Sequence, residues 1–376
     1  MGELLYKSAA EVINLKKKPS IYAPIGSYKD LLPYLVRRLL ENGANSSFIN
    51  RLLDPETDAA WLAENPALRI KKETKDIPLP KEIFEKRKNS SGFDMSENYN
   101  LQELEKDLNP FASKKISAES LYVGRHNEKS ISQKVFSISN GSEIGSVVFD
   151  DPMFIKNILE KDDDKTWSKK SVEERSKILL NIADDIEKEP YELIYFLINE
   201  AGKTLQNAID EIREAIDFLR YYSEQIKTID SKAFLEGPTG EKNNISYSPK
   251  GRFLCISPWN FPVAILTGQI SAALACGNNV IVKPSENTSI LGYLVIKKFH
   301  ENGVPLSALQ LILGDGMYGD VLTKIPNIHG VAFTGSLPTA KKIQKNLIES
   351  QNEITPLIAE TGGINVMIVD SSALLE

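Results

Sequence analysis

The spacing of hydrophobic residues changes near Tyr247, and this change separates two kinds of predicted structure. Residues Val172–Lys188 and Tyr191–Ile226 carry apolar positions at helical spacing, the second range interrupted at residues 200–204 by Glu-Ala-Gly-Lys-Thr. After Tyr247, short β-rich runs alternate with helical stretches. The runs are Phe253–Ile256, Asn279–Val282, Leu309–Leu313, Gly330–Phe333 and Pro356–Ala359. This alternation predicts βαβ units, and therefore an α/β fold with a doubly wound parallel sheet.

The segments before this region have a different character. A strand-like run at Ser20–Pro24 is followed by a predicted helix, Leu31–Glu41, which ends at Asn42 and Gly43 as helices often do. From Arg87 to Lys115 the chain is rich in Lys, Glu, Ser and Asn, which suggests a loosely held segment. We therefore expect three parts, at residues 1–60, 61–118 (a linker) and 119–376.

Charge and composition exclude several classes of protein. The net charge of −6 offers no basic surface for nucleic acid, and no stretch is apolar and long enough to suggest a membrane helix or a signal peptide. We expect a cytoplasmic protein whose partners are small molecules. The two cysteines, Cys255 and Cys276, lie in apolar runs and are expected to be small core residues rather than nucleophiles.

Polar residues follow four of the predicted strands. In doubly wound sheets, ligands bind beyond the carboxyl ends of the strands, so these positions are the candidates for a site. They are Asn260 after the first run, Lys283 and Glu286 after the second, Gly335 and Ser336 after the fourth, and Glu360 with Gly362 and Gly363 after the fifth. Glu286 with Lys283 suits a ribose, and free N–H groups beside Ser336 at a helix start suit a pyrophosphate.

A glycine-rich segment follows the third run. Residues 314–319, Gly-Asp-Gly-Met-Tyr-Gly, formally match the G-x-G-x-x-G dinucleotide pattern. The match is weak because the acidic residue expected about 20 positions later is absent, so the pyrophosphate is assigned to Gly335 and Ser336 instead.

Each candidate also has a simpler interpretation. Asn260 and Ser336 could cap turns or helices, Lys283 and Glu286 could form a surface ion pair, and the two glycines after Glu360 could form a tight turn. Singly, the simpler interpretation is favoured for all except Asn260. The order of these residues on successive strands is far more specific than any one of them.

The strings ISPWNFP, NNVIVKPSE, GVAFTGS and LIAETGG resemble the aldehyde dehydrogenase superfamily over about residues 120–376. The stretch AETGGINVMIVDSSAL, with Thr361 where most of the superfamily has leucine, is most similar to the 1-pyrroline-5-carboxylate dehydrogenase half of the bifunctional proline utilization A family. This resemblance implies NAD-dependent oxidation of L-glutamate γ-semialdehyde to glutamate in proline degradation.

The resemblance also assigns roles to residues of this chain. Asn260 would donate to the oxyanion that forms when a cysteine thiolate attacks the aldehyde, and Glu360 would be the general base for thioester hydrolysis. The residues implied to hold NAD are Ile256, Ser257, Trp259, Lys283, Glu286, Gly335 and Ser336. No metal site is implied.

The nucleophilic cysteine of the family lies a few tens of residues beyond the position of Glu360, and the sequence ends sixteen residues past it. We therefore expect a truncated member of the family that is inactive alone, unless complementing chains supply the missing parts.

Residues 21–52, IYAPIGSYKDLLPYLVRRLLENGANSSFINRL, resemble the last strand and helix of a (β/α)8 proline dehydrogenase barrel. The resemblance implies that Arg37 and Arg38 grip a substrate carboxylate, that Tyr22 and Tyr34 line the proline pocket, and that Glu41 lies near the flavin. From spacing alone, the favoured interpretation is a solvated helix face in which Arg37 or Arg38 pairs with Glu41. A complete barrel needs about 200 residues, so FAD, a cofactor of the parent enzyme, is not expected to bind this remnant.

Two other functions are compatible with the sequence. One is a non-catalytic nucleotide-binding or interaction protein derived from the family, and the other is an aldehyde dehydrogenase of different specificity. The barrel remnant argues against the second, because the bifunctional family joins the two activities.

Overall fold

The computed structural model describes residues 25–43, 54–55, 57–58, 60, 78–124, 130–160, 164–230 and 233–370. The chain forms two units, Met1–Ile77 and Pro78–Glu376. In the first unit, helix α2 (Tyr28–Gly43) contains the predicted helix and confirms it. The strand predicted at Ser20–Pro24 lies outside the described residues.

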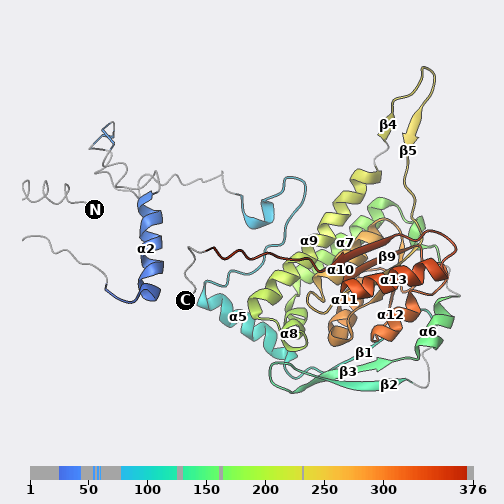
Figure 1. The fold of residues 1–376 in the computed structure, drawn as a ribbon, viewed down its shortest axis with the longest axis horizontal. Coiled ribbons are helices and arrows are strands. Elements are labelled where there is room, and N and C mark those ends of the chain that lie inside the picture. Colours follow the sequence, from blue (N-terminus) through green and yellow to red (C-terminus); the bar gives the residue numbers. More distant parts are fainter. Residues whose placement is uncertain are drawn as a thin grey trace, which may run out of the picture. The chain divides into compact units, whose positions relative to one another are not determined.

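The second unit is built on a five-stranded parallel sheet (Figure 1). Its strands are β6 (Arg252–Ile256), β7 (Asn279–Lys283), β8 (Leu309–Leu311), β9 (Gly330–Gly335) and β10 (Leu357–Thr361). They match the five predicted runs with small shifts at their ends. The spatial order is β10-β9-β6-β7-β8, so the chain builds outward from β6 in one direction and then in the other. The prediction of a doubly wound parallel sheet is thus confirmed, and the crevice of such a sheet lies where this order reverses, at β6 and β9.

Alternate residues of the central strands enter two separate cores. On β7, Val280 and Val282 pack into the core beneath the larger helical layer, while Ile281 packs into the core of the opposite face. Leu254 and Cys255 on β6 divide in the same way. Because both faces of a parallel sheet are covered by crossover helices, its strands read as continuous apolar runs. This is why the strands could be recognised from the sequence.

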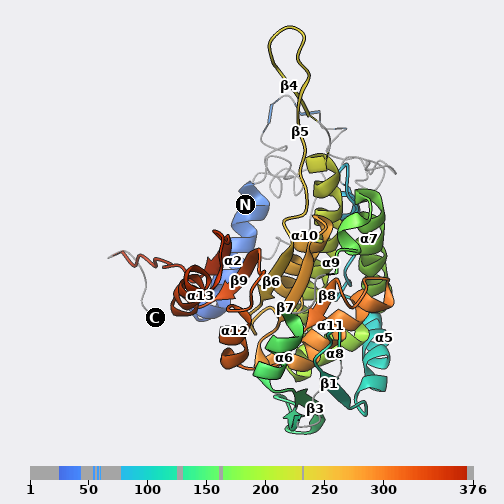
Figure 2. The ribbon, with the colours of Figure 1, turned by 90° about the vertical axis from the view of Figure 1, so that its right-hand side faces the viewer.

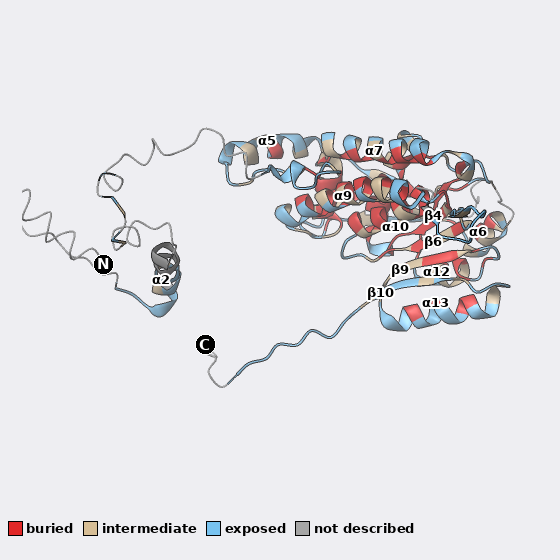
Figure 3. Cartoon of the chain, turned by 90° about the horizontal axis from the view of Figure 1, so that it is seen from above, coloured by how far each residue is buried: buried red, intermediate tan, exposed pale blue. Residues whose placement is uncertain are grey.

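Helices cover both faces of the sheet. Helices α10 (Ala264–Ala275) and α11 (Ser289–Glu301) lie on one face, backed by α7 (Val172–Lys188), α8 (Tyr191–Asn199) and α9 (Leu205–Asp230). The opposite face carries α6 (Pro152–Leu159), α12 (Gly316–Leu322) and α13 (Leu337–Ser350). Figure 3 shows buried residues concentrated on α9, α10 and the central strands, whereas β10 and the segment after it are exposed.

The helical layer begins at Val172, as predicted, and ends at Asp230, four residues beyond the predicted Ile226. Ser171 and Glu174 form a capping box at the start of α7, since the Ser171 hydroxyl accepts from the Glu174 N–H and the Glu174 carboxylate accepts from the Ser171 N–H. Glu-Ala-Gly-Lys-Thr separates α8 from α9. Gly202 has a φ of 68°, a left-handed conformation that suits glycine and ends α8.

The stretch from Arg87 to Lys115 is more ordered than its composition predicts. It contains helix α5 (Asn98–Leu108) with Leu104 buried, and Ser90 donates its backbone N–H to Asp217 of α9 at 2.7 Å. Burial alone would raise the pKa of Glu187, but hydrogen bonds from Arg220 and from the Ser91 N–H hold it at about 2. The expectation of a loosely held segment is therefore wrong here, because its polar residues pair with charges on α7 and α9. The division of the chain at residues 60 and 118 stays a prediction.

The remaining elements lie at the margins of the unit. A second sheet combines β1 (Ile116–Glu119), β3 (Glu143–Phe149) and β2 (Ile131–Phe136), and the hairpin of β4 (Ala233–Leu235) and β5 (Asn243–Ile245) projects from the unit (Figure 2). Short 3-10 turns are η2 (Pro80–Glu82), η3 (Asn109–Phe111), η4 (Trp167–Lys169) and η5 (Glu286–Thr288). Of these elements, η5 contributes to the candidate site.

Candidate functional site

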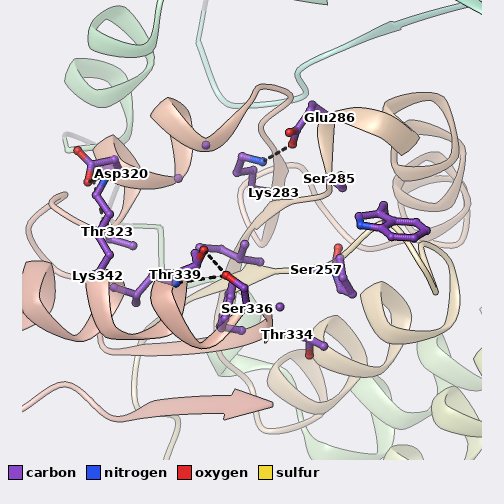
Figure 4. A pocket seen from close by; sticks show the side chains of 18 of the residues that line it. Ser257, Lys283, Ser285, Glu286, Asp320, Thr323, Thr334, Ser336, Thr339 and Lys342 are labelled. Carbon is purple, nitrogen blue, oxygen red and sulfur yellow. Dashed lines mark hydrogen bonds and ion pairs between the residues drawn. The ribbon is translucent and has the colours of Figure 1, made fainter. Parts of the chain in front are cut away.

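A cavity of about 270 Å³ lies at the carboxyl ends of β6, β7 and β9, between α12 and α13 (Figure 4). Its walls include all seven cofactor residues predicted from the sequence: Ile256, Ser257, Trp259, Lys283, Glu286, Gly335 and Ser336. These residues come from three strands that lie side by side, so the sheet order brings them together. A mostly preformed crevice of this kind is the usual place for a nucleotide in a doubly wound fold.

Lys283 and Glu286 face the cavity as a pair. The Lys283 ammonium lies 3.8 Å from the Glu286 carboxylate and donates to the Pro284 carbonyl at 3.0 Å. Burial lowers the pKa of Lys283, and the carboxylates of Glu286 and Asp315 partly oppose that change. The lysine is buried while Glu286 is about half exposed, so the pair is not a simple surface ion pair. It presents one donor and one acceptor to the cavity.

Ser336 caps helix α13 as well as lining the cavity. Its hydroxyl accepts from the Thr339 N–H at 3.4 Å and lies 2.9 Å from the Thr339 hydroxyl. Pro338, in the first turn of the helix, has no N–H group. The simpler interpretation of Ser336 as a helix cap is therefore correct. It coexists with a place in the cavity wall, where the start of α13 also carries the positive end of the helix dipole.

The glycine-rich segment contributes more than its sequence match indicated. Gly316 and Gly319 line the cavity, and a Cβ atom on Gly316 would meet nothing within 4 Å. Gly314 serves packing instead, since a Cβ there would lie 2.2 Å from the Tyr318 ring. Asp315 caps α12 by accepting from the Met317 N–H at 2.9 Å. Two of the three glycines thus belong to the cavity wall.

Sequence reasoning missed a polar cluster at the α12–α13 end of the cavity. The Asp320 carboxylate contacts Lys342 at 2.9 Å, Lys324 at 2.8 Å and the Asn346 amide at 3.0 Å. Hydrogen bonds from these three groups hold the pKa of Asp320 well below its usual range. The cluster spans two helices that are distant in sequence, and no motif signalled it.

Asn260 and Glu360 lie outside this cavity but at the same end of the sheet. Asn260 is exposed in the loop from β6 into α10. Glu360 is exposed on β10 opposite Thr334, whose hydroxyl accepts from Gln269 of α10 at 3.2 Å. Glu360 also lines a second cavity, of about 610 Å³, against α10. Glu360 thus lies on the α10 side of the sheet, and the catalytic roles of both residues stay predictions.

The two cysteines differ from each other. Cys255 is fully buried on β6, and burial raises the pKa of its thiol to about 12. Cys276 is exposed, so the expectation that both are core residues is wrong for Cys276. It forms the C-cap of α10, at the opposite end of the helix from Asn260, and an apolar run at a helix terminus need not be buried. The partial burial of its thiol raises the Cys276 pKa as well, although Arg175 opposes the rise.

Four residues of the predicted proline and flavin site lie on α2. They are Tyr34, Arg37, Arg38 and Glu41. Tyr34 is partly buried, and Tyr22 lies outside the described residues. Their proposed roles stay predictions.

None of the helices in the described ranges is long and apolar enough to cross a membrane.

Comparison with known proteins defines the class of this chain. The sequence model of the aldehyde dehydrogenase family matches residues 126–376, and that of proline dehydrogenase matches residues 1–51. The first match covers more than half of the chain, so the protein belongs to the aldehyde dehydrogenase family.

The similarity to proline utilization A covers the whole chain. The chain is 38% identical to the bifunctional protein PutA of Escherichia coli K12 and spans 29% of that protein's length. A mutant of Bradyrhizobium japonicum PutA superposes with a TM-score of 0.79 at 37% identity, over 99% of this chain and 36% of that one. A Thermus 1-pyrroline-5-carboxylate dehydrogenase with bound NAD has a TM-score of 0.68 at 28% identity, over 75% of this chain and 56% of that one. The resemblance to the proline utilization A family and the α/β fold are confirmed.

Proposed function

We propose that the cavity between α12 and α13 binds NAD as part of a 1-pyrroline-5-carboxylate dehydrogenase of the proline utilization A type. The observation that carries this proposal is the convergence of Lys283, Glu286 and Ser336 on one cavity at the switch point of the sheet. The NAD-bound relative supports the choice of cofactor.

The polar groups of the cavity divide between the parts of NAD. Glu286 accepts from the ribose hydroxyls, and the buried Lys283 ammonium donates to them. Gly335 and Ser336 lie where the start of α13 favours an anion, which suits the pyrophosphate. NAD supplies a nicotinamide that accepts a hydride.

Asn260 and Glu360 serve the aldehyde in this proposal. The Asn260 amide donates to the oxyanion that forms when a thiolate adds to the carbonyl carbon. Glu360 takes a proton from the water that hydrolyses the resulting thioester. The exposure of both side chains leaves them accessible to a substrate. The names of the relatives make L-glutamate γ-semialdehyde, the open form of 1-pyrroline-5-carboxylate, the proposed substrate.

We further propose that neither Cys255 nor Cys276 is the nucleophile that attacks the aldehyde. Cys255 is inaccessible and its pKa is raised to about 12, and Cys276 lies at the far end of α10. Cys255→Ser and Cys276→Ser should therefore leave the rate of NADH formation from NAD and γ-semialdehyde unchanged. Turnover that disappears in Cys255→Ser or Cys276→Ser would contradict this.

We propose that residues 1–51 belong to the proline dehydrogenase part of the family, in which Arg37 and Arg38 bind the substrate carboxylate.

Calorimetry with NAD tests the cavity directly. Lys283→Met should weaken NAD binding at least about tenfold, because a hydrogen bond to a charged group contributes about 1.5–3 kcal/mol. Lys298→Met is the matched control, since Lys298 pairs with Asp185 on the helical layer at 3.0 Å and does not line the cavity. The control should bind NAD normally. Absent binding in the unmodified chain, or equal affinity in Lys283→Met, would refute the assignment.

A further inference from the structure

Two buried glutamate side chains of the helical layer cap the two helices that follow the cofactor loops. Glu211 of α9 accepts from the backbone N–H groups of Val263 at 2.8 Å and Ala264 at 3.2 Å, at the start of α10. Glu200 accepts from Ile290 and Leu291, both at 2.8 Å, in the first turn of α11. The N–H groups at a helix start have no partner within the helix, so a buried oxygen acceptor there fixes the helix end.

These caps lie beside the candidate site. Helix α10 begins four residues after Asn260, and α11 begins three residues after Glu286. Glu200, Trp259 and Glu286 line one cavity of about 550 Å³, so the cap of α11 lies next to both loops. An element that fixes these helix starts also fixes the loops that precede them.

Lys203 completes the arrangement. Its ammonium lies 2.6 Å from the Glu211 carboxylate, with both side chains largely or fully buried, and 4.1 Å from the centre of the Phe261 ring. Phe261 is the neighbour of Asn260. The turn of Gly202 and the cap of α9 by Thr204, which accepts from the Asn207 N–H at 3.3 Å, place Lys203 between Glu211 and this loop.

We propose that Glu200, Lys203 and Glu211 are positioning residues that hold the Asn260 loop and the Glu286 loop in the geometry the site requires. This inference rests on the proposed function for the meaning of the loops, but its structural content stands apart from NAD. The proposal gives a role to the Glu-Ala-Gly-Lys-Thr segment, which contains Glu200 and Lys203. From the sequence alone, this segment was only an interruption between two helices.

Hydrogen exchange of the full chain without NAD tests whether these three residues hold the helix starts. Lys203→Met leaves the buried Glu211 carboxylate without its ion-pair partner, which favours its turning outward and releasing its N–H partners. Exchange at Val263 and Ala264 should accelerate at least about tenfold, which corresponds to about 1.4 kcal/mol of local opening free energy. Exchange in α13 should not change.

Three further variants separate positioning from general stability. Lys203→Arg keeps the charge and should restore slow exchange, and Lys203→Met with Glu211→Gln should restore it in part because no unpaired charge remains. Lys227→Met removes an exposed ion pair with Glu224 on the same helix and should have no effect. Glu200→Val should accelerate exchange at Ile290 and Leu291 while leaving Val263 unchanged. Unchanged exchange in Lys203→Met, or equal acceleration throughout the unit, would overturn the proposal.

NAD affinity supplies a second readout. If the unmodified chain binds NAD, Lys203→Met should weaken binding severalfold and Lys203→Arg should not. Local acceleration of exchange without any change in affinity would refute the positioning role. If the unmodified chain binds no NAD, the proposed function fails. The exchange results then decide by themselves whether the three residues hold the two loops.

Discussion

The two halves of the parallel sheet are stabilised in different ways. In the β6-β7-β8 half, α10 and α11 are capped by Glu211 and Glu200, which belong to another layer of the unit. In the β9-β10 half, α13 is capped by Ser336, its own neighbour in sequence. The first half therefore depends on tertiary packing for its helix starts, whereas the second depends on a local motif.

The two edge strands also differ, in how far the rest of the chain covers them. Strand β8 is buried throughout, and Leu311 exchanges backbone hydrogen bonds with Leu121 at 2.7 and 2.8 Å. On β10, Ile358 is 57% exposed, and the described residues include no strand paired with its outer edge. An exposed apolar edge is a surface that another chain segment can pair with. Among the described residues, the outer edge of the sheet is therefore covered at β8 and open at β10.

The largest effect expected from the comparison of the two halves is the pH dependence of stability that the buried Glu200 cap produces. Burial raises the pKa of Glu200 to about 8, against an ordinary value of 4.5, and its two backbone hydrogen bonds offset only part of that rise. The folded protein then binds more protons than the unfolded chain between these two values. Glu200 therefore stabilises the fold fully below about pH 4.5, and this contribution is lost as pH rises towards 8, by about 1 kcal/mol per pH unit.

Urea unfolding between pH 5 and 8, followed by the fluorescence of the buried Trp167, measures this slope. Glu200→Gln should abolish the Glu200 contribution to the slope. Glu349→Gln, which removes an exposed carboxylate of α13, should keep it. Identical slopes in Glu200→Gln and the unmodified chain would show that Glu200 stays ionised throughout.

The next effect compares the two edges by truncation. Leu311→Ala on β8 should lower the free energy of unfolding by at least about 2 kcal/mol, because it removes a fully buried side chain and leaves a cavity. Ile358→Ala on β10 should cost less than about 1 kcal/mol, since more than half of that side chain is already exposed. Urea unfolding measures both. Equal costs would mean that β10 is covered in solution.

A smaller effect is expected from the local cap. Ser336→Ala should destabilise α13 by about 1 kcal/mol, the usual contribution of a serine N-cap. Faster exchange should be confined to the first turn of α13, with Ser350→Ala, at the other end of the same helix, as the control. Faster exchange in α10 as well would show that the two halves are coupled.

The sequence predicted the elements better than the contacts between them. The bounds of α7 were predicted from helical spacing, which is local, and the strands from apolar runs that are buried on two faces. The caps of α10 and α11 join residues 52 and 90 positions apart, so no local pattern contains them. From sequence alone, a charged residue such as Glu211 is also predicted to be exposed, because its buried partners are not apparent.

Composition gave a wrong prediction for the stretch from Arg87 to Lys115, because polar residues of that stretch have partners in the helical layer. Ser90 and Ser91 belong to a stretch that resembles a linker, yet Asp217 and Glu187 anchor it to the helical layer. The cluster around Asp320 was missed because it requires α12 and α13 to lie side by side. The residues after the strands were found because the topology of a doubly wound sheet alone brings strand ends together.

The smallest expected change in stability, and the one that best tests the open edge, concerns the segment after β10. Val366, Met367 and Ile368 are each more than three-quarters exposed, in a region without regular structure. Val366→Lys with Ile368→Lys should change the free energy of unfolding by less than about 0.5 kcal/mol, because little apolar area is lost from the core. The same variant should lower self-association at high concentration, since lysine in an exposed apolar segment opposes its pairing with a strand of another chain. Light scattering across a concentration series measures this, with Lys341→Glu on α13 as a control that alters charge away from the edge. A variant that associates as strongly as the unmodified chain would show that this segment is not the surface through which the chains meet.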